Sequence, residues 1–302
     1  MEWSTEKIKA WEADAKQFER DLKIEVIFGN EENELFAIPT VNGYRSDIVF
    51  KYTPDEIEEV IKLTKDPLNI DKYQPNKLRD YQKEMLSDIS KNRFCALNVS
   101  RQIGTNMVVA HHVLHYCLSN YDRVALFYCE NEDTAEKFFK CVLDLLFKLP
   151  YHLQVGVRNI SFKDGELSLS NGSKLRVSPV STPIGYGVDY LILPEFSFNT
   201  AKNNNIIITS LLPTIFSKFN SRVLIYSCPN KKDDEFDKIF NSEENVYFKK
   251  IYPYTIMNLP NSKLFEETQI AMIGEDSFIK EYECIFPGTA EFRDRKLGIF
   301  FN

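Results

Sequence analysis

The stretch Phe94-Cys-Ala-Leu-Asn-Val-Ser-Arg-Gln-Ile-Gly-Thr-Asn106 decides the fold class of this chain. Residues 94–99 read as a continuous apolar strand, and residues 107–118 follow as a helix. A strand that is apolar throughout is buried on both faces, as in a parallel sheet covered by helices. The loop at residues 100–106 brings backbone N–H groups and the positive end of a helix to one place, which favours phosphate binding.

The same alternation of helices and apolar strands continues on both sides of this stretch, which indicates an α/β fold with a mainly parallel sheet flanked by helices. Residues 160–179 resemble a hairpin, with turns at Asp164-Gly165 and Asn171-Gly172. The sequence predicts further helices over residues 81–90, 134–149 and 206–219, and further strands over residues 123–129, 190–193 and 222–227.

The N-terminal residues 1–52 have a different pattern and predict a small α+β appendage. In residues 4–22 the apolar residues recur every three or four positions, which predicts an amphipathic helix. Three short strands are predicted after it, at residues 23–28, 35–41 and 47–52. Thr53-Pro54-Asp55-Glu56 then opens a helix that reaches about Lys65. The domain boundary is therefore predicted between an appendage, residues 1–52, and an α/β domain, residues 53–302.

The composition excludes several classes of protein. The 302 residues carry 37 Lys+Arg against 44 Asp+Glu, a net charge of −7, which argues against coating nucleic acid by bulk charge. No apolar run has the length of a membrane span, and the charged N-terminus is unlike a secretory signal, so an intracellular protein is expected. The six cysteines are scattered without a CxxC pair, so they are predicted to be buried, reduced thiols. His111 and His115 have the i, i+4 spacing of metal ligands, but no third ligand is apparent and no structural metal is expected.

Four features with possible chemistry follow in order along the α/β section. The first is Leu78-Arg79-Asp80-Tyr81-Gln82, in which the Gln82 amide offers a donor and an acceptor that match the edge of adenine. The second is the loop of residues 100–106. Active P-loops end in Gly-Lys-Ser/Thr, where the Lys reaches the outer phosphates and the hydroxyl holds magnesium. Here Thr105 has the Lys position and Asn106 has the hydroxyl position.

The third feature is the buried strand Tyr190-Leu-Ile-Leu-Pro-Glu195. A Walker B strand ends in Asp-Glu, with the Asp in the magnesium shell and the Glu polarising water. Glu195 is present and is the candidate catalytic residue, whereas Pro194 stands at the Asp position and has no ligand atom. The fourth feature is Ser227-Cys-Pro-Asn230 at the end of the next strand, where a motif coupling hydrolysis to motion is expected. Its candidate residues are Ser227, Pro229 and Asn230.

As an ordered set, these features resemble the ATPase domain of the large terminase, the DNA-packaging motor of tailed bacteriophages, closest to the contractile-tailed kind. The resemblance covers about residues 50–295 and does not include residues 1–50. We expect no nuclease domain of the terminase kind within this chain, and Ile184-Gly185 stands where the family has an Arg-Gly pair. The resembling segments are Lys77–Leu86, Asn98–Gly104, Asn171–Lys174 and Phe278–Thr289.

The resemblance implies a RecA-like (ASCE) P-loop NTPase fold that binds ATP and magnesium, both weakened here by the departures from the motifs. Arg101 stands where some terminases carry their basic P-loop residue. The implied partners are the phage portal protein, terminase subunits and double-stranded DNA, with further copies of the chain but no membrane, in the host cell cytoplasm or in the virion. The implied nucleotide-binding residues are Gln82, Ser100, Arg101, Gln102, Ile103, Gly104, Thr105 and Asn106.

Three interpretations of the function remain open at the level of sequence. The first is a pseudo-ATPase, a terminase-type domain kept as a structural or regulatory module, since the P-loop Lys and the Walker B Asp are missing. The second is an active packaging ATPase with atypical nucleotide ligands and a separately encoded nuclease. The third is a fragment of a helicase, which is disfavoured because no second RecA-like lobe follows in the sequence. Hydrolysis that depends on Glu195 would distinguish the second from the first.

Overall fold

The computed structural model describes residues 54–154, 157–179 and 187–298 of the chain. The predicted helix at residues 4–22, the predicted strands at residues 23–28, 35–41 and 47–52, and Ile184-Gly185 lie outside the described residues. The predicted appendage over residues 1–52 and its boundary therefore stay predictions.

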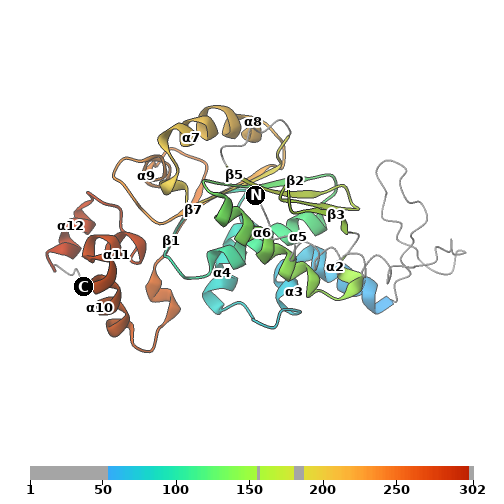
Figure 1. Cartoon of the computed structure of the whole chain (residues 1–302), viewed down its shortest axis with the longest axis horizontal. Helices are drawn as coiled ribbons and strands as arrows, with labels where there is room; N and C mark the ends of the chain where they lie inside the picture. The colour runs from blue at the N-terminus through green and yellow to red at the C-terminus, as the bar shows by residue number, and fades with distance from the viewer. Residues whose placement is uncertain (1–53, 155–156, 180–186, 299–302) are drawn as a thin grey trace, which may run out of the picture.

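An eight-stranded sheet, in the order β3-β4-β5-β2-β6-β7-β1-β8, forms the centre of the molecule (Figure 1). The five neighbouring pairs β5–β2, β2–β6, β6–β7, β7–β1 and β1–β8 are parallel. The pairs β3–β4 and β4–β5, at the other edge of the sheet, are antiparallel. The mainly parallel α/β fold is thus confirmed. The strands are β1 (Phe94–Val99), β2 (Val124–Cys129), β3 (Val157–Ser161), β4 (Glu166–Leu169), β5 (Lys174–Pro179), β6 (Tyr190–Pro194), β7 (Arg222–Ser227) and β8 (Phe248–Tyr252).

Helices cover both faces of this sheet, with a further helical group at its β8 end (Figure 1). The helices before the β3–β5 region are α2 (Pro54–Lys65), α3 (Leu68–Asp71), α4 (Asp80–Lys91), α5 (Thr105–Ser119), α6 (Glu132–Phe147) and the 3₁₀ turn η1 (Tyr151–Leu153). Those after it are η2 (Phe196–Phe198), α7 (Ala201–Ile206), η3 (Ile207–Leu211), α8 (Leu212–Phe216), α9 (Glu235–Asn241), η4 (Tyr254–Met257), α10 (Ser262–Ile273), α11 (Glu275–Glu281) and α12 (Ala290–Lys296).

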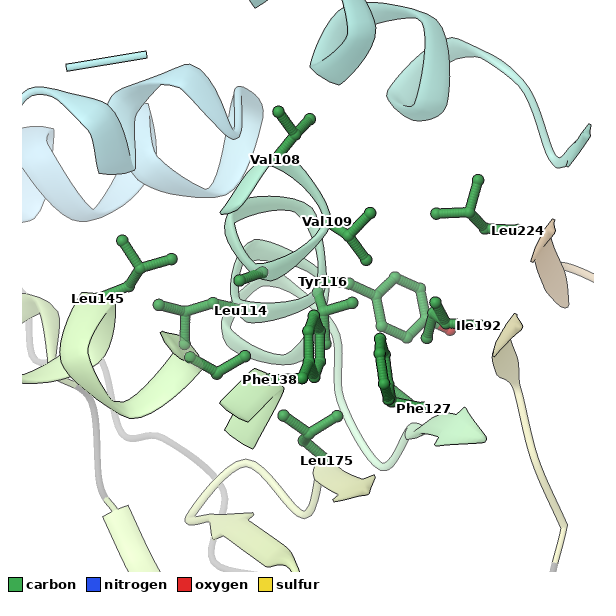
Figure 2. Packing of buried hydrophobic residues seen from close by; sticks show 14 of the residues in the cluster. Val108, Val109, Leu114, Tyr116, Phe127, Phe138, Leu145, Leu175, Ile192 and Leu224 are labelled. Atoms are coloured by element: carbon green, nitrogen blue, oxygen red, sulfur yellow. The ribbon is translucent and has the colours of Figure 1, made fainter. Parts of the chain in front are cut away.

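The larger core lies between the sheet and the pair α5 and α6, where apolar side chains from helices and strands meet (Figure 2). Val109 of α5 faces the strand residues Ile192 and Leu224, all of them buried. The rings of Phe127 in β2 and Phe138 in α6 stack with centroids 3.7 Å apart. Because burial of such surface stabilises by roughly 25 cal/mol per Å², this packing fixes α5, and with it the loop that precedes α5, against the strands.

The second core covers the opposite face of the sheet. Alternate residues of the central strands, such as Leu191 in β6 and Ile225 in β7, point to this side and pack against η3, α8 and α9. Continuous burial on both faces explains why these strands are apolar along their whole length. Because both faces of the sheet are covered, the ends of β1, β6 and β7 are held in fixed positions relative to one another.

Most predicted elements are present, with shifts at their ends and one correction. The hairpin predicted over residues 160–179 is an antiparallel meander of β3, β4 and β5. The helix predicted over residues 206–219 begins earlier, in α7, and contains the π-helical turn η3 before α8. Pro213 explains the wider turn, because a proline ring clashes with the carbonyl four residues earlier in an ordinary α-helix, and that carbonyl belongs to Thr209.

Candidate phosphate-binding site

The carboxyl ends of β1, β7, β6 and β2 meet at one edge of the sheet, since these strands are parallel neighbours. Ligands of open α/β sheets bind outside such an edge. The structure brings together there the loop that follows β1, Glu195 at the end of β6, and the segment Ser227–Asn230 at the end of β7. β7 separates the loop-bearing strand β1 from β6.

The loop between β1 and α5 contains a row of backbone N–H groups, in which Gln102, Gly104 and Asn106 are exposed residues and Ile103 and Thr105 are buried. Gln102 and Gly104 both have positive φ angles, 64° and 82°, which turns successive N–H groups toward the same side. Within the described part of the chain, no acceptor is found for the N–H groups of residues 102–106. They lie at the N-terminus of the 15-residue helix α5, where the helix dipole adds partial positive charge. This arrangement is suited to an anion such as phosphate.

Gln82 and Tyr81 in the first turn of α4 hold this loop from one side. The Gln82 Nε2 and the Tyr81 hydroxyl both donate to the Ile103 carbonyl, at 3.0 and 3.2 Å. The Gln82 Oε1 accepts from the Arg79 backbone N–H at 2.9 Å. Both ends of the Gln82 amide are therefore engaged within the protein. The contact of Gln82 with adenine stays a prediction.

The C-terminal segment holds the same loop from the other side, which the sequence did not reveal. The backbone N–H of Ser100 donates to the Tyr252 carbonyl, and that of Arg101 donates to the Glu281 carbonyl, both at 2.9 Å. The Asn98 Nδ2 donates to the Cys284 carbonyl at 2.7 Å. Because these partners are distant in sequence, no local spacing signals them.

The side chain of Arg101, the predicted basic residue of the loop, is paired with a carboxylate. Its Nε lies 2.8 Å from the Glu281 Oε2, and its guanidinium lies over the Phe198 ring, 5.6 Å from the centroid. The Arg101 side chain is 50% exposed, and exposed ion pairs contribute about 0–1 kcal/mol. A bound phosphate can therefore compete with Glu281 for this guanidinium.

This competition gives a first prediction. Glu281→Gln removes the competing charge, so the affinity for ATP is expected to rise about threefold to fivefold, equivalent to roughly 1 kcal/mol or less. Titration calorimetry measures the change. Asp276→Asn is the matched control, because Asp276 lies on the same helix α11 but pairs with Lys296, at 2.7 Å. An unchanged affinity in Glu281→Gln would mean that Arg101 does not contact the nucleotide.

Glu195 and the predicted coupling segment are joined through the turn η2. Glu195 is exposed at the end of β6, with a positive φ of 48°. Two residues later, the Ser197 N–H donates to the Ser227 Oγ, and the Ser197 carbonyl accepts from the Asn230 Nδ2, both at 3.2 Å. The turn that follows Glu195 is therefore in contact with the end of β7. Pro229 is buried and has no polar contact of this kind among the described residues.

The residues at the position of a P-loop magnesium do not fit that ion. Magnesium takes oxygen ligands in octahedral geometry. The Asn106 Oδ1 already accepts a hydrogen bond from the Tyr226 hydroxyl at 2.7 Å, and Pro194 has no ligand atom. No group of three or more His, Cys, Asp or Glu side chains is placed to hold a metal within the described ranges. His111, whose spacing suggested a ligand, is buried with its Nδ1 2.8 Å from the Met107 carbonyl.

An open groove of about 540 Å³ adjoins the loop. Tyr81 and Tyr252 line this groove, together with Arg79, Lys250 and Met257. The same two tyrosines contact the loop, Tyr81 through its hydroxyl and Tyr252 through its carbonyl. The groove and the loop thus share two contact residues. The groove is also lined by Asp80 and Glu84, and the Lys250 Nζ pairs with the Glu84 carboxylate at 2.6 Å.

Comparison with solved structures identifies the fold. No protein-family model matches the sequence. The large terminase ATPase domain of Thermus phage P74-26 has a TM-score of 0.58 at 14% identity, over 72% of this chain and 96% of that domain. The HK97 bacteriophage large terminase gives 0.53 at 14% identity, over 80% of this chain and 52% of that protein.

The large terminase of the thermophilic bacteriophage D6E, in complex with ADP, gives a TM-score of 0.55 at 11% identity, over 69% of this chain and 53% of that protein. The match thus spans an isolated terminase ATPase domain almost fully and about half of whole terminases. The predicted resemblance in fold to terminase ATPase domains is confirmed. No helix of the described residues is long and apolar enough to cross a membrane.

Proposed function

We propose that this chain is a terminase-type ATPase module of viral DNA packaging that binds a nucleoside triphosphate and hydrolyses it very slowly or not at all. The observation that carries the binding is the row of N–H groups at residues 102–106, which have no acceptor among the described residues and lie at the start of α5. The D6E terminase, which has this fold, was solved with ADP. Thr105 and Pro194, at the Lys and Asp positions, oppose fast hydrolysis.

In the proposed complex, the phosphates lie on the loop and the base lies in the groove beside it. Tyr81 provides aromatic surface there, whereas the Tyr252 ring is buried, and Arg101 provides a charge at the loop. Charge-assisted hydrogen bonds contribute about 1.5–3 kcal/mol each. The absence of a Lys at position 105 therefore weakens binding by roughly tenfold to a hundredfold relative to an active P-loop.

Slow hydrolysis follows from the missing positive charges. Phosphoryl transfer depends almost entirely on positioning and on neutralisation of the charge that develops on the phosphate. Glu195 would orient a water at the end of β6, and in the proposed complex the phosphate charge would be met by Arg101 and the loop N–H groups, without a Lys or a Walker B Asp. In this proposal the turn η2 still links Glu195 to Ser227 and Asn230, so the conformational path from site to β7 is retained.

The proposal places the chain in the host cell cytoplasm during particle assembly, or in the virion. Its partners would be the portal protein, other terminase subunits or further copies of itself, with double-stranded DNA as the substrate of the assembly. The terminase fold supports this assignment. Copies that bind nucleotide without turnover would act as structural or regulatory positions in such an assembly.

A hydrolysis assay separates this proposal from an active motor. We expect phosphate release by the purified chain to equal that of Glu195→Gln, because the residual rate does not depend on Glu195. Glu130→Gln is the matched control, since Glu130 lies at the end of the neighbouring strand β2 and its Oε2 contacts the Asn203 Nδ2 at 3.0 Å. Activity that is lost in Glu195→Gln but kept in Glu130→Gln would establish an active ATPase with atypical ligands instead.

A further inference from the structure

We infer that the loop of residues 100–106 takes phosphate groups without a divalent cation, and that the hydroxyl of Tyr226 stands where the cation would bind beside Asn106. The inference rests on the proposed function, which it deepens by naming the chemical form of the ligand. Free ATP, rather than its magnesium complex, is the ligand that this site fits.

The sheet places Tyr226 between the two positions that hold magnesium in an active P-loop protein. Asn106, at the hydroxyl position, lies in the first turn of α5, the helix that follows β1 in the chain. Pro194, at the Asp position, is the last residue of β6. β7 runs between these strands, and its Tyr226 pairs in register with Pro194. From there the Tyr226 hydroxyl reaches the Asn106 Oδ1 at 2.7 Å.

The Tyr226 side chain is fixed in this position as a hydrogen-bond donor. It is 3% exposed and belongs to the core between the sheet and α5. Burial, with the nearby charge of Glu195 as a second cause, raises the pKa of Tyr226 well above its ordinary value. The hydroxyl therefore remains protonated, and its proton points to the Asn106 Oδ1.

A cation at this place would find one free acceptor direction on the Asn106 carbonyl oxygen and no ligand atom on Pro194. Magnesium needs lone pairs directed at it, whereas the Tyr226 proton occupies one of the two acceptor directions of the Asn106 carbonyl oxygen. A cation there would also lie beside the positive end of the O–H dipole. In this arrangement the phosphate charge is met by the loop N–H groups, the dipole of α5 and Arg101.

The test is the affinity of the full chain for ATP in magnesium chloride and in EDTA at matched ionic strength, measured by titration calorimetry. Because magnesium chloride converts most of the ATP to its magnesium complex, we expect binding in EDTA to be about threefold or more tighter than binding in magnesium chloride. Tyr226→Phe is expected to weaken ATP binding in EDTA about threefold to tenfold, because Asn106 and the first turn of α5 lose their anchor. Tyr247→Phe should have no effect, since the buried Tyr247 hydroxyl has no partner among the described residues.

Each outcome decides a different claim. Binding that is equally tight or tighter with magnesium overturns the inference and leaves the proposed nucleotide binding intact. Unchanged affinity in Tyr226→Phe overturns the role of Tyr226. Absence of ATP binding in both buffers overturns the proposed function, and the inference with it. If Tyr226→Phe does not fold, the comparison of the two buffers with the unaltered chain still decides the question of the cation.

Discussion

Replacing Gly104 with valine is expected to abolish ATP binding and to destabilise the chain by about 1.5–3.5 kcal/mol. Gly104 has a φ of 82°, and a Cβ there would lie 2.4 Å from the Gln82 Nε2. The left-handed conformation costs an L-residue about 1–2 kcal/mol, and loss of the hydrogen bond from Gln82 to Ile103 adds about 0.5–1.5 kcal/mol. Thermal unfolding and ATP titration measure the two effects.

Gly298→Val is the matched control for this substitution. Gly298 also has a positive φ, 66°, but nothing lies within 4 Å of the position of its Cβ. It should therefore show the cost of backbone strain, about 1–2 kcal/mol, with no loss of ATP binding. Equal stability and equal ATP affinity in the two variants would contradict the account in which Gln82 clamps the phosphate loop.

Acidification from pH 7.5 to pH 5.5 is expected to lower the free energy of unfolding by up to about 4 kcal/mol. Burial lowers the pKa of His111 and His115, and lowers the pKa of His112 well below its ordinary value of 6.5. Below about pH 6.5, these histidines therefore bind protons more readily in the unfolded chain than in the folded chain. Stability is complete above about pH 6.5 and declines below it, by up to about 1.4 kcal/mol per pH unit for each histidine.

Urea unfolding at the two pH values measures this dependence. His112→Phe provides the internal check, because His112 is buried in α5 with its Nδ1 3.0 Å from the Tyr190 hydroxyl. The variant loses that contact at both pH values, but its stability should depend less steeply on pH than that of the unaltered chain. An equal slope would show that His112 is not held neutral in the folded state.

The elements that could be predicted from sequence are those with a strong local pattern. β1 has the predicted limits, residues 94–99, because a strand buried on both faces is apolar throughout. The α5 helix and the loop before it followed from the same stretch. The edge strand β8 was missed, since Lys249 and Lys250 interrupt its apolar pattern. In the structure, the Lys250 Nζ pairs with Glu84 and Asp88 of α4, both at 2.6 Å.

The candidate site shows where prediction from sequence stops. The positions of Gly104, Glu195 and Ser227 at one edge followed from strand order, and the structure places them there. The contacts that set their chemistry could not be predicted, because Glu281 and Tyr226 come from remote segments. A motif shows which residues are missing, whereas only the fold shows which side chain stands in their place.

Amide hydrogen exchange of residues 102–106 in the presence and absence of ATP tests the central claim most directly. The N–H groups of this loop have no acceptor among the described residues, so those of the exposed residues Gln102, Gly104 and Asn106 are expected to exchange rapidly in the free chain. If they hold the phosphates, saturating ATP slows their exchange by about fivefold or more while α9, on the opposite face of the sheet, is unchanged. Exchange at residues 102–106 that stays the same at millimolar ATP would contradict the account.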